Sequence, residues 1–131
     1  MRKLLMGAVS LFVLLALSAT LRAQREEWVF LGDRHVDGQI DHDVIHVGRV
    51  EGKFRAIQFR VEGGAVEFDR VVVHFGNGTE ERLDVRERVP GGGHTHAIDL
   101  PGDRRRIESV EMWYSKARWE HRPKVALFGI R

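Results

Sequence analysis

The apolar positions of this chain fall into short runs with a spacing of two, which is the period of a half-buried β-strand. In the run RAIQFRV, Ile57, Phe59 and Val61 share one face, while Gln58 and Arg60 share the other. Runs of this kind recur between Gly, Pro, Asn and Asp at residues 26–32, 44–50, 54–62, 66–75, 79–89, 95–100, 106–116 and 124–131. No long stretch keeps the spacing of a helix. The pattern predicts an all-β fold, a single antiparallel β-sandwich, jelly-roll-like, with about eight strands.

One connection has a strong local signal. Asn77-Gly78 separates two alternating runs, VVVHF and TEERLDV. This residue pair is preferred in type I′ hairpin turns, in which both central residues have positive φ. The sequence therefore predicts a β-hairpin with a type I′ turn at these two residues.

The first residues have the features of a secretory signal peptide. Two basic residues precede an uncharged apolar run over residues 4–17, and small residues follow, with Ala23 or Ala19 at the expected cleavage site. The run is shorter than the ~20 apolar residues that span a bilayer, and we expect no transmembrane segment later in the chain. We therefore expect a signal peptide over residues 1–23 and one β-sandwich domain over residues 24–131, exported to the periplasm or beyond the cell.

Charge and cysteine content exclude several classes of function. The full chain has 21 Lys and Arg against 19 Asp and Glu. Loss of residues 1–23 removes basic residues and no acidic one, so the formal charge changes from +2 to about −1. Sequence-independent binding to the phosphate backbone of a nucleic acid needs a net basic face, so we expect no nucleic-acid partner. The absence of cysteine excludes disulfides, thiolate metal sites and a cysteine nucleophile.

Two histidines and an acidic stretch are candidate metal ligands. His94 and His96 share one face of an extended strand, but a metal site needs three or four ligands. Asp41 and Asp43 could supply the others for Zn²⁺, or could bind Ca²⁺ through several oxygens. The alternative is local: the glycines at 91–93 form a turn, and the histidines begin the next strand near solvent. In that interpretation the protein has no cofactor.

Aromatic and basic residues near the C-terminus are candidates for ligand binding. Trp113 lies on the strand face opposite Met112, and Trp119 follows in the next loop, so either ring could stack on a sugar. Arg104 and Arg106 could hold an anionic partner, such as an acidic glycan or a lipid head group, by bidentate contacts. The alternatives are structural: the tryptophans cover the core, and the arginines protect a strand edge from pairing.

The segments LGDRHVDGQIDHDVIHVG, GKFRAIQF, FGNGTEERL, AIDLPGDRRRIESVEMWY and KVALFGIR resemble a bacterial family of small exported all-β proteins that is described as a domain of unknown function. The shared positions are mostly Gly, Asp and apolar residues. The resemblance therefore implies an exported all-β domain and implies no activity.

These observations favour an exported, non-enzymatic binding module of the cell envelope, with a glycan or another envelope component as its partner. No serine lies in a G-x-S-x-G motif, so the sequence gives little support for catalysis by a nucleophilic side chain. The alternative is a metal-binding protein, which could be a metal-dependent hydrolase, that uses His94, His96 and the loop from Asp37 to His46. The sequence leaves the identity of the ligand and the oligomeric state open.

Overall fold

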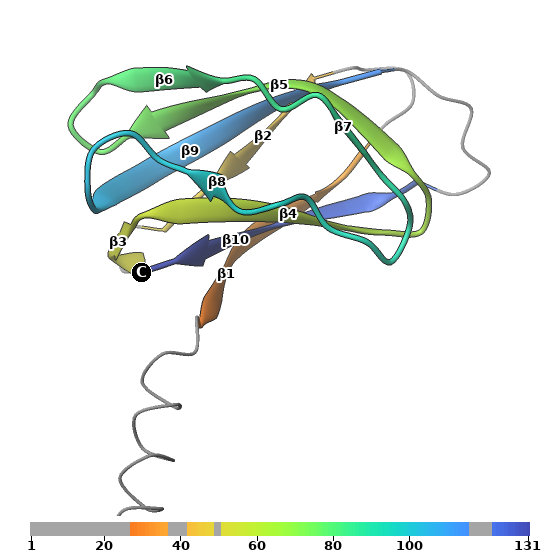
Figure 1. The fold of residues 1–131 in the computed structure, drawn as a ribbon, viewed down its shortest axis with the longest axis horizontal. Helices are drawn as coiled ribbons and strands as arrows, with labels where there is room; N and C mark the ends of the chain where they lie inside the picture. Colours follow the sequence, from red (N-terminus) through yellow and green to blue (C-terminus); the bar gives the residue numbers. More distant parts are fainter. Residues whose placement is uncertain (1–26, 37–41, 49–50, 116–121) are drawn as a thin grey trace, which may run out of the picture.

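A computed structural model describes residues 27–36, 42–48, 51–115 and 122–131 of the protein. This part of the chain consists of strands and their connections, arranged as two sheets packed face to face (Figure 1). The strands are β1 (Trp28–His35), β2 (His42–His46), β3 (Lys53–Phe54), β4 (Ala56–Glu62), β5 (Val66–Phe75), β6 (Glu80–Leu83), β7 (Glu87–Val89), β8 (Ile98–Asp99), β9 (Arg105–Tyr114) and β10 (Lys124–Ile130). Within these residues no helix has the length and apolar character needed to cross a membrane.

The connections follow a jelly-roll pattern. One sheet has the order β1-β10-β4-β8, and the other has the order β2-β9-β5-β6, with β3 paired to β9 and β7 paired to β5. All pairs are antiparallel, and strands from opposite ends of the chain are neighbours, β1 beside β10 and β2 beside β9. The predicted antiparallel sandwich is confirmed. Two of the expected runs are each divided into two strands, β3 with β4 and β6 with β7.

The core lies between the two sheets and is built by the alternation seen in the sequence. Ile57, Phe59 and Val61 of β4 are buried, and they belong to one hydrophobic core with buried side chains of the second sheet. Phe59 stacks on Phe68 of β5 with ring centroids 5.1 Å apart, which joins the two layers. Gln58 of β4 is also buried, because the chain at Thr95 covers it and accepts its hydrogen bond at 3.1 Å.

The predicted hairpin joins β5 to β6, but the predicted turn type is wrong. The Phe75 N–H donates a hydrogen bond to the Thr79 carbonyl across the turn at 2.8 Å, and three residues lie between these two. Gly78 has a φ of 86° and its N–H donates to the Phe75 carbonyl at 3.1 Å, whereas no residue other than glycine has positive φ in the described ranges. A three-residue connection of this kind is a type I turn followed by a left-handed glycine. Asn77 therefore acts through its side chain, which accepts the N–H of Thr79 at 3.1 Å.

Candidate functional site

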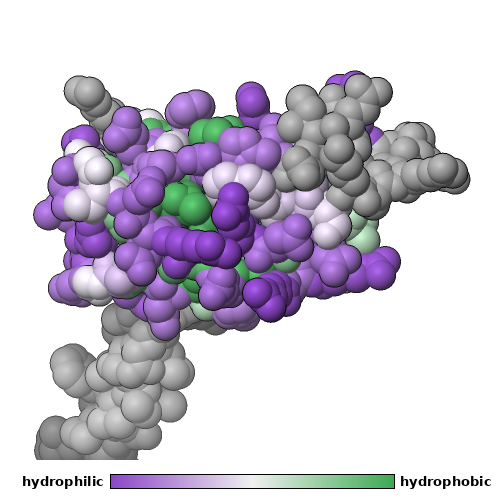
Figure 2. Space-filling view, turned by 90° about the horizontal axis from the view of Figure 1, so that it is seen from above, coloured by the Kyte–Doolittle hydropathy of each residue, from purple (hydrophilic) through white to green (hydrophobic). Residues whose placement is uncertain are grey.

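The outer face of the six-stranded sheet is largely polar. Figure 2 looks onto this side of the molecule and shows hydrophilic residues over most of it, with a small hydrophobic area near the middle. Strand β9 runs along the face, and its Val110 and Met112 point into the core. Trp113 therefore points outward, as predicted from the alternation. The pairing of β5 with β9 shifts by one residue between Ile107 and Ser109, so Arg106 lies on the same face as Trp113 although the two are seven residues apart. They are separated by about 23 Å along the extended strand.

A basic hollow lies at one end of this face, where the β5–β6 turn meets β3 and the start of β9. Its volume is about 210 Å³, and it is lined by Lys53, Phe75, Gly76, Asn77, Arg104, Arg105 and Arg106. Lys53 and Arg106 are directly paired across β3 and β9. Their neighbours Phe54 and Ile107 are buried, so the two cationic side chains lie together on the outer face. No carboxylate is among the lining residues, so every charged side chain that lines the hollow is positive.

Arg105 has a structural part in the basic hollow. Its guanidinium donates to Thr79 Oγ1 at 2.8 Å and to the Pro101 carbonyl at 3.2 Å. The same group lies 3.7 Å from the centroid of the Phe75 ring. These contacts tie the β5–β6 turn to the start of β9, and they hold the walls of the hollow in place.

The other cations of the basic hollow are Lys53, Arg104 and Arg106. In the described ranges no Asp or Glu forms an ion pair with Lys53, Arg104 or Arg106. Gly76 leaves room for the Arg106 guanidinium, since a Cβ at this position would lie 2.5 Å from Arg106 Nε and 3.0 Å from its Nη2. The missing side chain lets the guanidinium lie directly against the turn. The arrangement is suited to holding an anion.

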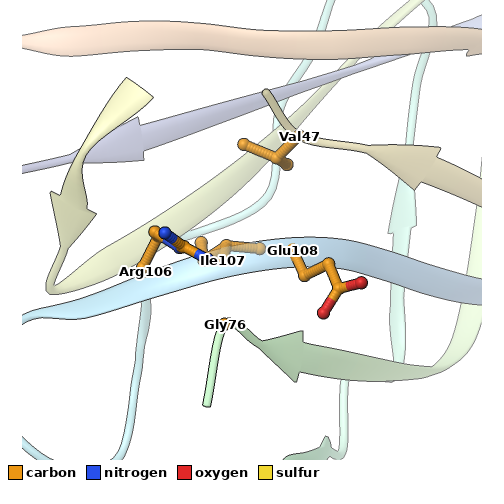
Figure 3. A pocket seen from close by; sticks show the side chains of 5 residues that line it. All are labelled: Val47, Gly76, Arg106, Ile107 and Glu108. Carbon is orange, nitrogen blue, oxygen red and sulfur yellow. The ribbon is translucent and has the colours of Figure 1, made fainter. Parts of the chain in front are cut away.

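A second, mixed hollow adjoins the first. It has a volume of about 130 Å³ and is lined by Val47, Gly76, Arg106, Ile107 and Glu108. In Figure 3, Arg106 and Glu108 extend from β9 on either side of Ile107, with Val47 across the hollow. Gly76 and Arg106 belong to both hollows. A guanidinium thus separates a cationic site from one that contains a carboxylate.

A row of polar contacts, two hydrogen bonds and one ion-pair contact, crosses the middle of the face over four strands. Glu111 of β9 accepts a hydrogen bond from His42 Nε2 of β2 at 2.7 Å and another from His74 Nε2 of β5. His74 Nδ1 lies 3.4 Å from a carboxylate oxygen of Glu80 on β6. The hydrogen bond from His74 lowers the pKa of Glu111 below its ordinary value of 4.5, and the bond from His42 acts in the same direction, while partial burial opposes both.

Trp113 lies between two neighbours at the other end of the face. The His42 ring stacks on it with centroids 4.5 Å apart and planes inclined by 26°. Arg70 Cζ lies 4.0 Å from the centroid of the indole ring. His42 and Arg70 come from the strands on either side of β9, so both faces of the ring are covered. A sugar could stack on Trp113 only by displacing one of them, and its role in binding stays a prediction.

The predicted metal ligands do not converge in the described part of the chain. His94 Nδ1 lies 2.8 Å from the Thr95 carbonyl oxygen, and His96 Nδ1 lies 2.8 Å from a carboxylate oxygen of Glu87. Asp43 lies on β2 of the six-stranded sheet, and its carboxylate accepts a hydrogen bond from the Tyr114 hydroxyl at 2.7 Å. Across the described ranges, no three His, Asp or Glu side chains are grouped so as to hold a metal ion.

Three further predictions concern parts of the chain outside the described residues. The proposed metal ligand Asp41, the proposed ligand-stacking Trp119 and the signal peptide over residues 1–23 all lie there. Metal binding and the binding role of Trp119 therefore stay predictions.

A family model matches residues 8–129, which is nearly the whole chain. The chain belongs to the family described as Domain of unknown function (DUF2541). This match confirms the resemblance seen in the sequence. No curated protein sequence matches the DUF2541 chain.

Among solved structures, the DUF2541 chain is similar to Pseudomonas aeruginosa AlgX, with a TM-score of 0.54 and 11% sequence identity. The similarity covers 78% of this chain and 26% of the AlgX chain. The DUF2541 chain thus spans about a quarter of that protein. At this level of identity the likeness concerns the fold alone.

Several residues of the candidate site were missed by the sequence analysis. Lys53, Gly76 and Glu108 have ordinary sequence surroundings, and only the pairing of β3 with β9 and the position of the turn bring them to Arg106. Gly76, the glycine before Asn77-Gly78, was the one available signal, because an additional glycine in a turn indicates that another group approaches the backbone closely.

The opposite sheet has an aromatic patch that was also missed. Phe30 of β1 is 51% exposed, and its ring meets Phe128 of β10 edge to face at 5.6 Å. Arg60 Cζ lies 3.8 Å from the Phe128 ring centroid and 6.0 Å from that of Trp28. The alternation in WVF places Trp28 and Phe30 on one face, which is a signal that could have found them.

Proposed function

We propose that the protein is an exported, non-enzymatic binding module of the cell envelope, and that the basic hollow binds an anionic ligand, such as an acidic glycan or another anionic envelope component. The observation that carries the proposal is the grouping of Lys53, Arg104 and Arg106 in one hollow without a carboxylate among its lining residues.

Electrostatics supports this proposal. Like charges brought together raise the free energy of the folded protein, and a bound anion relieves that repulsion. Arg106 and Arg104 can each form two parallel hydrogen bonds to a carboxylate, phosphate or sulfate group. Arg105 is already bonded within the protein, which fixes the walls and lowers the cost of ordering the site on binding.

The chemistry of the lining supports binding rather than catalysis. The side chains around the basic hollow supply positive charge, an amide and one aromatic ring. No Ser, Thr, Cys, His, Asp or Glu is among these lining residues, so the hollow itself provides neither a hydroxyl nucleophile nor a general base. Export agrees with the leader-like pattern of residues 1–23.

Isothermal titration calorimetry with inorganic phosphate and with glucuronic acid tests the anion site. We expect the double variant Arg104→Gln with Arg106→Gln to bind at least about tenfold more weakly than the parent, because each charge-assisted pair contributes about 1.5–3 kcal/mol. Binding by the parent should also weaken as salt is raised.

The matched control removes the same charge elsewhere. Arg86 and Arg88 are exposed, and β7 pairs with the end of β5 that lies away from the hollow. Arg86→Gln with Arg88→Gln should leave the affinity for both anions within about twofold. Absence of anion binding by the parent, or an equal loss in the control, would refute the proposal.

A further inference from the structure

The two hollows together define an order of charges along the outer face. The basic hollow presents Lys53 and Arg104 on one side of the Arg106 guanidinium. The mixed hollow presents the carboxylate of Glu108 on the other side. A ligand that occupies both therefore meets positive charge first and negative charge next.

Glu108 disfavours a long polyanion. A chain of phosphates or sulfates that continued beyond Arg106 would place its next negative group beside this carboxylate, and the repulsion would offset part of the gain at Arg106. Glu108 is exposed, and in the described ranges it has no ion-pair partner. An ionised carboxylate is an acceptor only, so the group it favours is a hydrogen-bond donor.

The walls and size of the mixed hollow indicate what surrounds that donor. Val47 and Ile107 supply apolar surface beside the carboxylate. The volumes of about 210 Å³ and 130 Å³ are each below the ~300–1,000 Å³ of pockets for drug-sized ligands. The pair of hollows suits a small ligand, or one terminal unit of a longer one, that has CH groups as well as hydroxyls.

We propose that the ligand of the two hollows is a hydroxylated anion with the chemistry of a sugar phosphate or a sugar acid. Its anionic group lies in the basic hollow against Arg104 and Arg106, and a neighbouring hydroxyl donates a hydrogen bond to Glu108. This inference rests on the proposed function, because it assigns the ligand class of the same anion site. Glu108 is thus the residue that selects hydroxylated anions over bare ones.

The test compares four probes by isothermal titration calorimetry: glucose 6-phosphate, glucuronic acid, inorganic phosphate and tripolyphosphate. If the ligand is a sugar phosphate, glucose 6-phosphate should bind to the parent about tenfold more tightly than inorganic phosphate, the gain of one hydrogen bond to a charged acceptor. Glucuronic acid distinguishes a sugar acid from a sugar phosphate as the source of the anion. We expect at least one of the two sugar ligands to bind more tightly than either bare anion.

The variant Glu108→Gln should move the two classes of ligand in opposite directions. Loss of the negative charge weakens the hydrogen bond from the sugar hydroxyl, so the sugar ligand should lose affinity by about fivefold or more. The same change removes repulsion, so inorganic phosphate and tripolyphosphate should bind more tightly. Glu67→Gln makes the same change of charge at an exposed site on the far end of β5 and should alter no affinity.

The outcomes separate this inference from the proposed function. If the parent binds inorganic phosphate but neither sugar ligand more tightly, the anion site stands and the role of Glu108 is refuted. If Glu108→Gln shifts all probes in one direction, selection by Glu108 is likewise refuted. If the parent binds none of the four probes, the proposed function fails as well. Thermal melts check that each variant is folded, and we expect little change because both substitutions are at exposed residues.

Discussion

Replacement of Glu111 by alanine should lower the free energy of unfolding by about 2 kcal/mol at pH 7. The Glu111 carboxylate accepts hydrogen bonds from His42 on β2 and His74 on β5, and so links both neighbours of β9. A hydrogen bond to a charged group contributes about 1.5–3 kcal/mol when buried. The Glu111 side chain is 23% exposed and the two imidazoles are 37% and 31% exposed, so solvent reduces each contribution to about 1 kcal/mol.

The loss of stability in Glu111→Ala should become smaller as the pH falls. Hydrogen bonding by the two histidines lowers the pKa of Glu111 in the folded protein below its ordinary 4.5. A depressed folded pKa means that the ionised carboxylate stabilises the fold above pH 4.5, and that this stabilisation is lost as the pH falls through the folded pKa. The difference between the parent and Glu111→Ala should therefore be full at pH 7 and should shrink below about pH 4.5.

Urea titrations followed by circular dichroism at pH 7, 5 and 3 measure this difference. Glu111→Gln keeps the shape and one acceptor, so it should be intermediate at pH 7, and its stability should lack the part of the acid dependence that belongs to Glu111. Glu81→Ala, at an exposed position on β6, is the control and should change stability by less than about 0.5 kcal/mol. A Glu111→Ala protein as stable as the parent at pH 7, or a difference that stays constant down to pH 3, would refute the reasoning.

Three other predictions concern the turn, the histidines and the leader. Gly78→Val should destabilise the fold by about 1 kcal/mol or more, because Gly78 has a φ of 86° that a β-branched residue tolerates poorly; an equally stable variant in urea would contradict this. His94→Ala with His96→Ala should leave the melting temperature within a few degrees, with no response to zinc or EDTA. A rise of the parent's melting temperature with zinc that is lost in the double variant would instead make both histidines metal ligands. Intact-mass measurement of protein from the envelope fraction should show the loss of about 19 to 24 N-terminal residues, and full-length chain in the cytosol would count against export.

The sequence determined where most strands run and, within a regular stretch of strand, which side chains share a face. Alternation is a local property of the chain, so it placed Met112 and Tyr114 in the core and Trp113 on the outer face, and the structure agrees. Asn77-Gly78 likewise located a hairpin, since few residue types adopt positive φ at low cost. These features needed no knowledge of which strands lie side by side.

The turn type was decided by pairing across the hairpin. The backbone hydrogen bond between Phe75 and Thr79 makes the connection three residues long. A connection of that length favours a type I turn followed by one left-handed residue. The residue pair Asn77-Gly78 is compatible with both turns, so the local sequence did not distinguish them.

The candidate site was decided by the tertiary structure. Alternation says that Glu111 points outward with Trp113, but continued along β9 it would put Arg106 on the inner face with Val110 and Met112. The register shift opposite His74 and Phe75 turns Arg106 outward. Alternation also does not say which side chains from other strands lie beside these residues. Those neighbours follow from the strand order and register, which place Lys53 against Arg106 and put Glu111 between two histidines. Register is fixed by how the two buried faces fit together over the whole sandwich. For this reason the outward faces of Glu111 and Trp113 could be predicted from the sequence, whereas the outward position of Arg106 and the hollows that it lines required the folded chain.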